Sequence, residues 1–132
     1  MLNRPENTVM KKFKLMIVDD SFVIRSIIAD AHNSESYDLV AIASNGKEAI
    51  DKFHQFQPQI VTMDLTMPHM DGLACIDKLI ELDPAIQIVV ISALSDQATG
   101  IKALKKGASG FVIKPFTNER VCEAIDTVAK LI

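Results

Sequence analysis

The stretch "KLMIVDDS", residues 14–21, closes an apolar run with two adjacent carboxylates, Asp19 and Asp20. The run has the length of a β-strand, and its apolar residues are continuous rather than alternating, which is typical of a strand covered on both faces. Two like charges repel each other and resist burial, so their place at the end of such a strand needs a chemical reason. The stretch therefore predicts a buried strand with a polar site at its carboxyl end.

Four further runs of strand length follow along the chain, and helical patterns separate them. The predicted strands cover residues 13–18, 38–43, 59–63, 86–91 and 110–113. Between them apolar residues recur at helical spacing, as at Leu73, Ile76 and Leu79. A fourth helix is predicted around residues 95–106, and a fifth from Thr117 onward.

The strict alternation of strands and helices, five times over, predicts a doubly wound (βα)5 fold of the α/β class. Its sheet would hold five parallel strands, with helices on both faces that make a three-layer sandwich. The 132 residues suffice for one domain of this kind. We assign residues 13–132 to that domain and residues 1–12 to a polar N-terminal tail.

Composition and charge argue against several classes of partner. No stretch approaches the roughly 20 apolar residues of a membrane-spanning helix, and the N-terminus lacks the apolar segment of a secretory signal. The net charge of -3 opposes direct binding to nucleic acid, which draws on a basic surface. We therefore expect a cytoplasmic protein with no membrane or direct nucleic-acid partner. Cys75 and Cys122 lack a metal-binding spacing, and we expect them to serve packing.

Polar side chains follow the carboxyl ends of four predicted strands, where ligands bind in folds of this class. They are Asp19 and Asp20 after the first strand, Asp64 at the third, Ser92 after the fourth and Lys114 after the fifth. The acidic pair alone is more typical of a solvated helix N-cap than of a metal site. Three converging carboxylates, however, would raise each other's pKa and destabilise the fold unless a cation shared them. Oxygen ligands at a small, open site suit Mg²⁺.

The same residues can also handle a phosphoryl group. Asp64 would supply a nucleophilic carboxylate, Ser92 a hydrogen-bond donor and Lys114 a cation for a phosphoryl oxygen. The residue types at the strand ends therefore indicate phosphoryl transfer to a carboxylate.

Four segments, "VDDS", "MDLTMPHMDG", "VVISALS" and "GASGFVIKPF", resemble the receiver domain of two-component response regulators. The likeness is greatest to the single-domain kind related to the chemotaxis regulator, and it covers residues 14–132. The separations between Asp20, Asp64, Ser92 and Lys114 are also similar to those of the family. The resemblance implies a flavodoxin-like sheet in the strand order 2-1-3-4-5, for which the chemotaxis regulator is itself the standard example.

The resemblance implies a role for each acidic residue. Asp64 is similar to the phosphoacceptor, which takes a phosphoryl group from a donor phosphohistidine. Asp20 and Asp64 are similar to direct ligands of Mg²⁺, for which Mn²⁺ can substitute. Asp19 would act through water, and the backbone carbonyl of Thr66 would complete the metal site.

The resemblance also implies a switch. Ser92 matches the switch hydroxyl, with Ala93 beside it in the phosphoryl-binding loop, Lys114 matches the residue that pairs with the phosphoryl group, and Phe111 matches the switch aromatic. Phosphorylation would then be read on the face made by the fourth helix, the fifth strand and the fifth helix.

Three further residues are expected to shape the loops. Pro68 and Gly72 would set the course of the chain after Asp64, and Gly72 would open the third helix. The bond between Lys114 and Pro115 is cis in the family.

Thr66 and Leu94 match the two positions that flank the approach of a hydrolytic water in this family. Leu94 can only exclude a water, and Thr66 is short, so we expect slower self-dephosphorylation than in the fast chemotaxis regulator.

The implied partners are a sensor histidine kinase or a phosphotransfer protein on the input side. On the output side they are a downstream protein target or an output domain missing from this sequence. The protein would be a monomer or a phosphorylation-dependent dimer, and a signalling phosphoacceptor rather than an enzyme.

Three other interpretations compete with this one. A phosphohydrolase of the haloacid dehalogenase type needs a second Asp two residues after the nucleophile, where this chain has Thr66. A flavodoxin would need a Gly- and Thr-rich phosphate loop in place of "DDSFVIR". A degenerate receiver, used only as an interaction module, would be expected to lack the acidic pair, Asp64 or Lys114.

Overall fold

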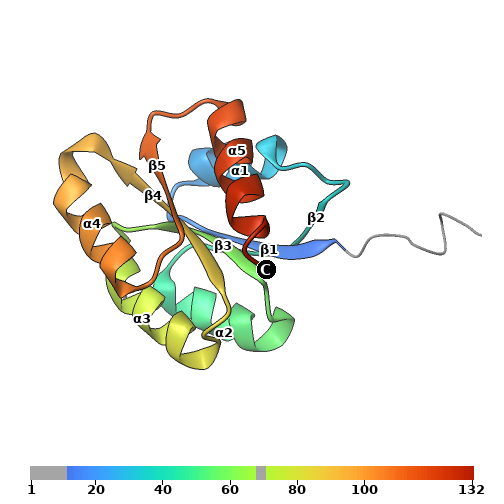
Figure 1. Cartoon of the computed structure of the whole chain (residues 1–132), viewed down its shortest axis with the longest axis horizontal. Coiled ribbons are helices and arrows are strands. Elements are labelled where there is room, and N and C mark those ends of the chain that lie inside the picture. The colour runs from blue at the N-terminus through green and yellow to red at the C-terminus, as the bar shows by residue number, and fades with distance from the viewer. Residues whose placement is uncertain (1–11, 68–70) are drawn as a thin grey trace, which may run out of the picture.

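A computed structural model describes residues 12–67 and 71–132, in which strands and helices alternate five times (Figure 1). The strands are β1 (Phe13–Val18), β2 (Tyr37–Ala43), β3 (Ile60–Asp64), β4 (Gln87–Ala93) and β5 (Gly110–Lys114). The helices are α1 (Phe22–Ala31), α2 (Gly46–Phe56), α3 (Gly72–Leu82), α4 (Gln97–Lys106) and α5 (Asn118–Ala129). All strand pairs are parallel and the order is β2-β1-β3-β4-β5, so the predicted fold class is confirmed.

Two apolar cores lie on opposite faces of the sheet. One core joins alternate residues of the strands, such as Met16, Val61 and Ile88, to α2, α3 and α4. The other joins the intervening residues, such as Leu15 and Ile17, to α1 and α5, which pack side by side in Figure 1. Both faces of the strands are therefore covered, which explains why their sequences are continuously apolar. Within 12–67 and 71–132, no helix is both long and apolar enough to cross a membrane.

Local sequence signals position the starts of α1, α2, α3 and α5 and the end of α4. The side chains of Ser21, Asn45, Asp71 and Thr117 each accept a hydrogen bond from the third backbone amide of the helix that follows. Helix α4 differs, because Asp96 stands at its N-cap without such a bond, after a 3-10 turn over Leu94–Asp96. Gly107 ends α4 at a φ of 119°, which favours glycine.

Strands β3, β4 and β5 run further at their carboxyl ends than the apolar patterns predict, β3 by the single residue Asp64. Strand β4 continues to Ala93 and β5 to Lys114, because the parallel pairing extends through Ser92 with Ile113 and Ala93 with Lys114. Ser92 and Lys114 therefore lie inside the strands rather than after them. Backbone pairing with a neighbouring strand fixes these two polar residues more firmly than a loop would.

Strand β2, at one side of the sheet, pairs irregularly with β1. Leu15 pairs with Leu39 and Met16 with Ala41, so one additional residue of β2, Val40, stands between two consecutive pairs. Close by, the ammonium of Lys52 on α2 donates to the carbonyl oxygen of Ile42 at 2.5 Å. The pairing on this side of the sheet is thus locally irregular, and Lys52 covers one of its carbonyl groups.

Thr62 is a polar residue inside the α1/α5 core. It lies between Ile17 and Val89 on the neighbouring strands, it is fully buried, and its hydroxyl has no hydrogen-bond partner among the described residues. We expect Thr62→Val to raise the free energy of unfolding by about 1 kcal/mol, because it removes an unpaired hydroxyl without changing the shape of the side chain. Urea denaturation followed by circular dichroism measures the change.

The exposed Thr127 provides the control, because Thr127→Val should change stability by less than about 0.5 kcal/mol. A clear loss of stability in Thr62→Val would show that the buried hydroxyl has a partner, such as an ordered water.

Candidate functional site

Three carboxylates meet where β1 and β3 end. The two strands are neighbours in the sheet, so Asp19 and Asp20, which follow β1, come close to Asp64, the last residue of β3. One carboxylate oxygen of each residue lies within 4.8 Å of the others. Asp19 and Asp64 are buried and Asp20 is exposed, so the cluster has one open side. The expected convergence of the three side chains is present.

Lys114 reaches this cluster from the end of β5. Its ammonium nitrogen lies 3.6 Å from Oδ2 of Asp19 and 3.5 Å from Oδ1 of Asp64, so one cation bridges the two buried carboxylates. The Lys114–Pro115 peptide bond is cis, as the resemblance implied.

The buried carboxylates resist ionisation. Burial, followed by the charge of Asp19, raises the pKa of Asp64 to about 6, although Lys114 and the Thr66 amide act in the opposite direction. Burial also raises the pKa of Asp19, against hydrogen bonding from the Ser21 amide and the charge of Lys114. A single lysine therefore offsets only part of the cost of placing these charges together.

The donor set fits a small divalent cation. Oδ2 of Asp19 is buried and accepts no hydrogen bond within the described part of the chain, although Lys114 is nearby. The other donors in the cluster are also carboxylate oxygens, which hard cations such as Mg²⁺ prefer. A cation at the open side of the cluster would relieve the repulsion that raises the pKa of Asp64.

Thr66 connects Asp64 to a residue that the sequence analysis did not single out. Its backbone amide donates to Oδ1 of Asp64 at 3.2 Å, and its hydroxyl donates to Oδ2 of Asp96 at 3.5 Å. Asp96 occupies the N-cap position of α4, where a capping role is the ordinary expectation. The absence of that cap is a property of the folded loop, so no sequence signal indicated the contact with Thr66.

The remaining expected site residues surround the cluster at different depths. Ser92 is buried on β4, and among residues 12–67 and 71–132 its hydroxyl makes only a long 3.5 Å contact with the carbonyl of Ala93. Leu94, in the turn that follows, is 62% exposed. Phe111 on β5 is half-buried, and its carbonyl accepts a hydrogen bond from the guanidinium of Arg120 at 2.8 Å. The sequence analysis did not identify Arg120.

Gly72 allows α3 to begin directly against the loop that follows Asp64. A Cβ atom at this position would lie 2.5 Å from Cα of Leu65 and 2.6 Å from the carbonyl oxygen of Asp64. Such distances are far below van der Waals contact, so the close approach requires glycine. Gly72 opens α3 as expected, whereas Pro68, the other residue expected to shape this loop, lies outside the described residues.

Comparison with known proteins gives a consistent result. The profile of the response regulator receiver domain matches residues 15–126. Chemotaxis protein CheY of Thermotoga maritima is 41% identical over 117 residues, which cover 89% of this chain and 98% of that protein. CheY of Bacillus subtilis is 38% identical over 113 residues, which cover 86% of this chain and 94% of that protein.

Solved structures show the same relationship. The receiver domain of AraT from Geobacillus stearothermophilus superposes with a TM-score of 0.86 at 25% identity, covering 91% of this chain and 95% of that one. A chain of the CheX-CheY-BeF3-Mg+2 complex from Borrelia burgdorferi gives a TM-score of 0.82 at 33% identity, with 89% of each chain covered. The chain therefore belongs to the response regulator receiver domain family, among the members that resemble CheY.

Proposed function

We propose that Asp64 accepts a phosphoryl group from a phosphohistidine in a reaction that depends on Mg²⁺. The donor would be a sensor histidine kinase or a phosphotransfer protein. One observation supports this most directly: a buried Asp64 lies beside two further carboxylates and 3.5 Å from the ammonium of Lys114. This arrangement combines a nucleophile with a place for a metal ion and a cation for a phosphoryl oxygen.

The transfer itself would need little acid or base chemistry. A carboxylate oxygen of Asp64 attacks the phosphorus atom, the bond between phosphorus and the imidazole nitrogen breaks, and its electron pair returns to the donor histidine. Lys114 neutralises charge on a phosphoryl oxygen, and the hydroxyl of Ser92, whose contact with the Ala93 carbonyl is long at 3.5 Å, can turn toward another. When bound, Mg²⁺ would supply further charge neutralisation, with Asp20, Asp64 and the Thr66 carbonyl as its expected ligands.

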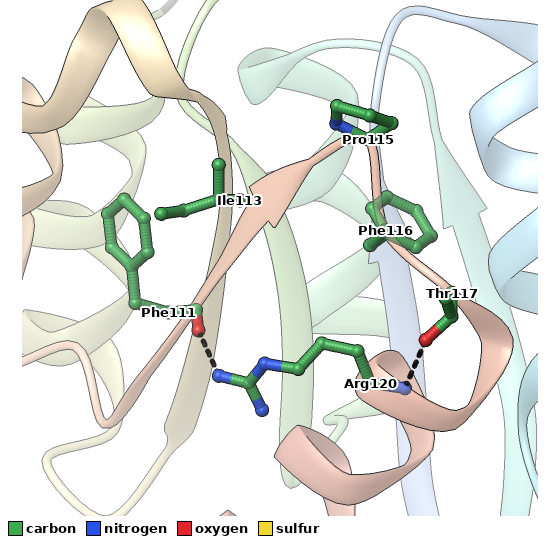
Figure 2. A pocket seen from close by; sticks show the side chains of 6 residues that line it. All are labelled: Phe111, Ile113, Pro115, Phe116, Thr117 and Arg120. Atoms are coloured by element: carbon green, nitrogen blue, oxygen red, sulfur yellow. Dashed lines mark hydrogen bonds between the residues drawn. The ribbon is translucent and has the colours of Figure 1, made fainter.

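A downstream protein would recognise the phosphorylated state at the face made by α4, β5 and α5. Figure 2 shows a groove on this face, lined by Phe111, Ile113, Pro115, Phe116, Thr117 and Arg120. Ile101 and Leu104 add exposed apolar surface on α4, at 54% and 43% exposure. We propose that a downstream protein binds here and that the signalling takes place in the cytoplasm, without direct contact to nucleic acid or membrane.

Labelling with acetyl phosphate tests the proposal. Incorporation of phosphate, followed by intact-mass spectrometry, should require Mg²⁺ and stop when the metal is chelated. Asp20→Ala should weaken Mg²⁺ binding by about tenfold or more, and by more than Asp19→Ala. The reason is that Asp19 already accepts the Ser21 amide and pairs with Lys114, whereas Asp20 is exposed at the open side.

Isothermal titration with Mg²⁺ measures this order, and Asp30→Ala, an exposed acid on α1, controls for the loss of one negative charge. A larger effect of Asp19→Ala would reverse the ligand assignment, and labelling without any divalent ion would contradict the proposal.

The lifetime of the phosphoryl group should be long. Leu94 cannot hold a water, and the hydroxyl of Thr66 already donates to Asp96. Replacing both residues, Thr66→Asn with Leu94→Glu, should accelerate the loss of label several-fold, because the new side chains can hold a water in line with the bond to Asp64. The decay of phosphorylated protein after removal of the donor measures the effect. An unchanged or slower decay would show that other groups control the approach of water.

A further inference from the structure

The ring of Phe111 lies directly against the backbone of α4 at Gly100. A Cβ atom at Gly100 would lie 1.8 Å from Cε2 of this ring, 2.5 Å from Cζ and 2.9 Å from Cδ2. The backbone fixes the position of a Cβ atom, so no rotation at residue 100 could relieve this overlap. Any side chain at Gly100 therefore excludes the ring from its present place.

Nothing else in α4 accounts for a glycine at this position. Gly100 is the fourth residue of the helix and is buried, and glycine is the least favourable interior residue after proline. The helix ends at a different glycine, Gly107, and among the described residues only Gly107 is a glycine with positive φ. The space that the Phe111 ring occupies is thus the physical reason for Gly100. The ring in turn packs against the core on this face of the sheet.

The contacts around Phe111 leave its ring as the part that can move. Its backbone is held in β5 by pairing with β4 and by the 2.8 Å hydrogen bond from Arg120 to its carbonyl, drawn in Figure 2. Phe111 is only half-buried, and its ring lies against α4 at Gly100. A rotation of this side chain would change the packing between β5 and α4 without breaking the sheet.

We propose that Gly100 is the seat of the Phe111 ring, and that occupation of this seat couples the Asp64 site to α4. In the unphosphorylated protein the seated ring holds α4 against β5. When the hydroxyl of Ser92 turns toward a phosphoryl group, it leaves a space behind it. The Phe111 ring then moves from Gly100 into that space, and α4 shifts. This coupling rests on the proposed function, because a phosphoryl group at Asp64 is what would move the ring. Gly100 is then a positioning residue for the output face, one step removed from the phosphoryl group.

Thermal unfolding of the four proteins that combine glycine or alanine at position 100 with phenylalanine or alanine at position 111 tests this role of Gly100, because the sign of the effect should reverse. Alanine has the higher helix propensity, yet Gly100→Ala should lower the Tm of the otherwise unchanged protein, because its Cβ displaces the Phe111 ring from its contact with the core. In a Phe111→Ala background the ring is gone, and Gly100→Ala should raise the Tm by about 3 °C. Lys102→Ala, on the exposed side of the same helix, should have the same small effect in both backgrounds. If Gly100→Ala changed the Tm in the same direction in both backgrounds, the claim that Gly100 accommodates the Phe111 ring would be wrong.

Amide chemical shifts test the coupling. Beryllofluoride with Mg²⁺ should shift resonances of residues 97–106 in the unchanged protein, and Gly100→Ala should largely abolish these shifts while those of Asp19, Asp20 and residues 64–66 remain. An unaltered response of α4 in Gly100→Ala would refute the coupling. If the resonances near Asp64 failed to respond in the unchanged protein, that result would contradict the proposed function. The comparison of Tm values would still test whether the Phe111 ring packs against Gly100.

Discussion

Asp64→Asn should reduce the incorporation of phosphate from acetyl phosphate to background. The substitution keeps the size of the side chain and an oxygen that can accept the Thr66 amide, but it removes the nucleophilic carboxylate. Asp19 should not replace it, because its two oxygens accept the Ser21 amide and face Lys114. Intact-mass spectrometry after incubation with acetyl phosphate and Mg²⁺ measures the incorporation.

Two exposed aspartates provide matched controls for this loss. Asp71→Asn retains an oxygen that can cap α3, and Asp77→Asn removes only the charge that pairs with Lys106, so both variants should label like the unchanged protein. Undiminished incorporation in Asp64→Asn would show that another residue is the acceptor.

The same substitution should stabilise the fold in the absence of metal. Because the pKa of Asp64 is raised from 3.8 to about 6 in the folded protein, the folded state binds this proton more tightly than the unfolded chain does. The contribution of Asp64 to stability is therefore complete below pH 3.8, and it is lost as the pH rises through about 6. At about pH 7.5 we expect Asp64→Asn to exceed the unchanged protein by about 1–2 kcal/mol in free energy of unfolding, after allowance for solvent at the open side.

Urea denaturation in a chelating buffer measures this difference at several pH values. The advantage of Asp64→Asn should shrink as the solution is acidified from about pH 7.5 to about pH 4.5, because the carboxyl group of the unchanged protein becomes neutral. Mg²⁺ should stabilise the unchanged protein more than the variant, since it binds the ionised cluster. A constant difference across this range would mean that the fold does not perturb Asp64.

The sheet and the carboxylate cluster were both accessible from sequence for the same reason. Strands covered on both faces carry continuous apolar runs, so a residue such as Asp64 is easily located at the end of one. Parallel strands place their carboxyl ends at one edge of the sheet, which brings Asp19 and Asp20 to Asp64. The order of the strands could not be derived in this way. The alternation of strands and helices predicts parallel pairing and the hand of the crossovers, and only the resemblance to the family supplied the strand order.

The features that escaped prediction depend on side-chain packing between distant elements. Gly100 interrupts a helical pattern, and only the folded structure shows the ring of Phe111 behind it. The bonds of Arg120 to the Phe111 carbonyl and of Thr66 to Asp96 are likewise contacts between surface elements whose spacing follows from the fold. The boundaries at Ser92 and Lys114 were misplaced because pairing with a neighbouring strand, rather than apolar content, sets where a strand stops.

The irregular pairing of β2 has a consequence for self-association. An outer strand with evenly spaced, unpaired amides and carbonyls is a template on which another polypeptide can add a strand and begin an aggregate. At β2 the additional residue Val40 breaks that even spacing, and the Lys52 ammonium occupies the Ile42 carbonyl. A second copy would therefore find no regular ladder along β2. Dimers that form at high concentration should join through helical or side-chain surfaces, which leaves the sheet of each copy intact.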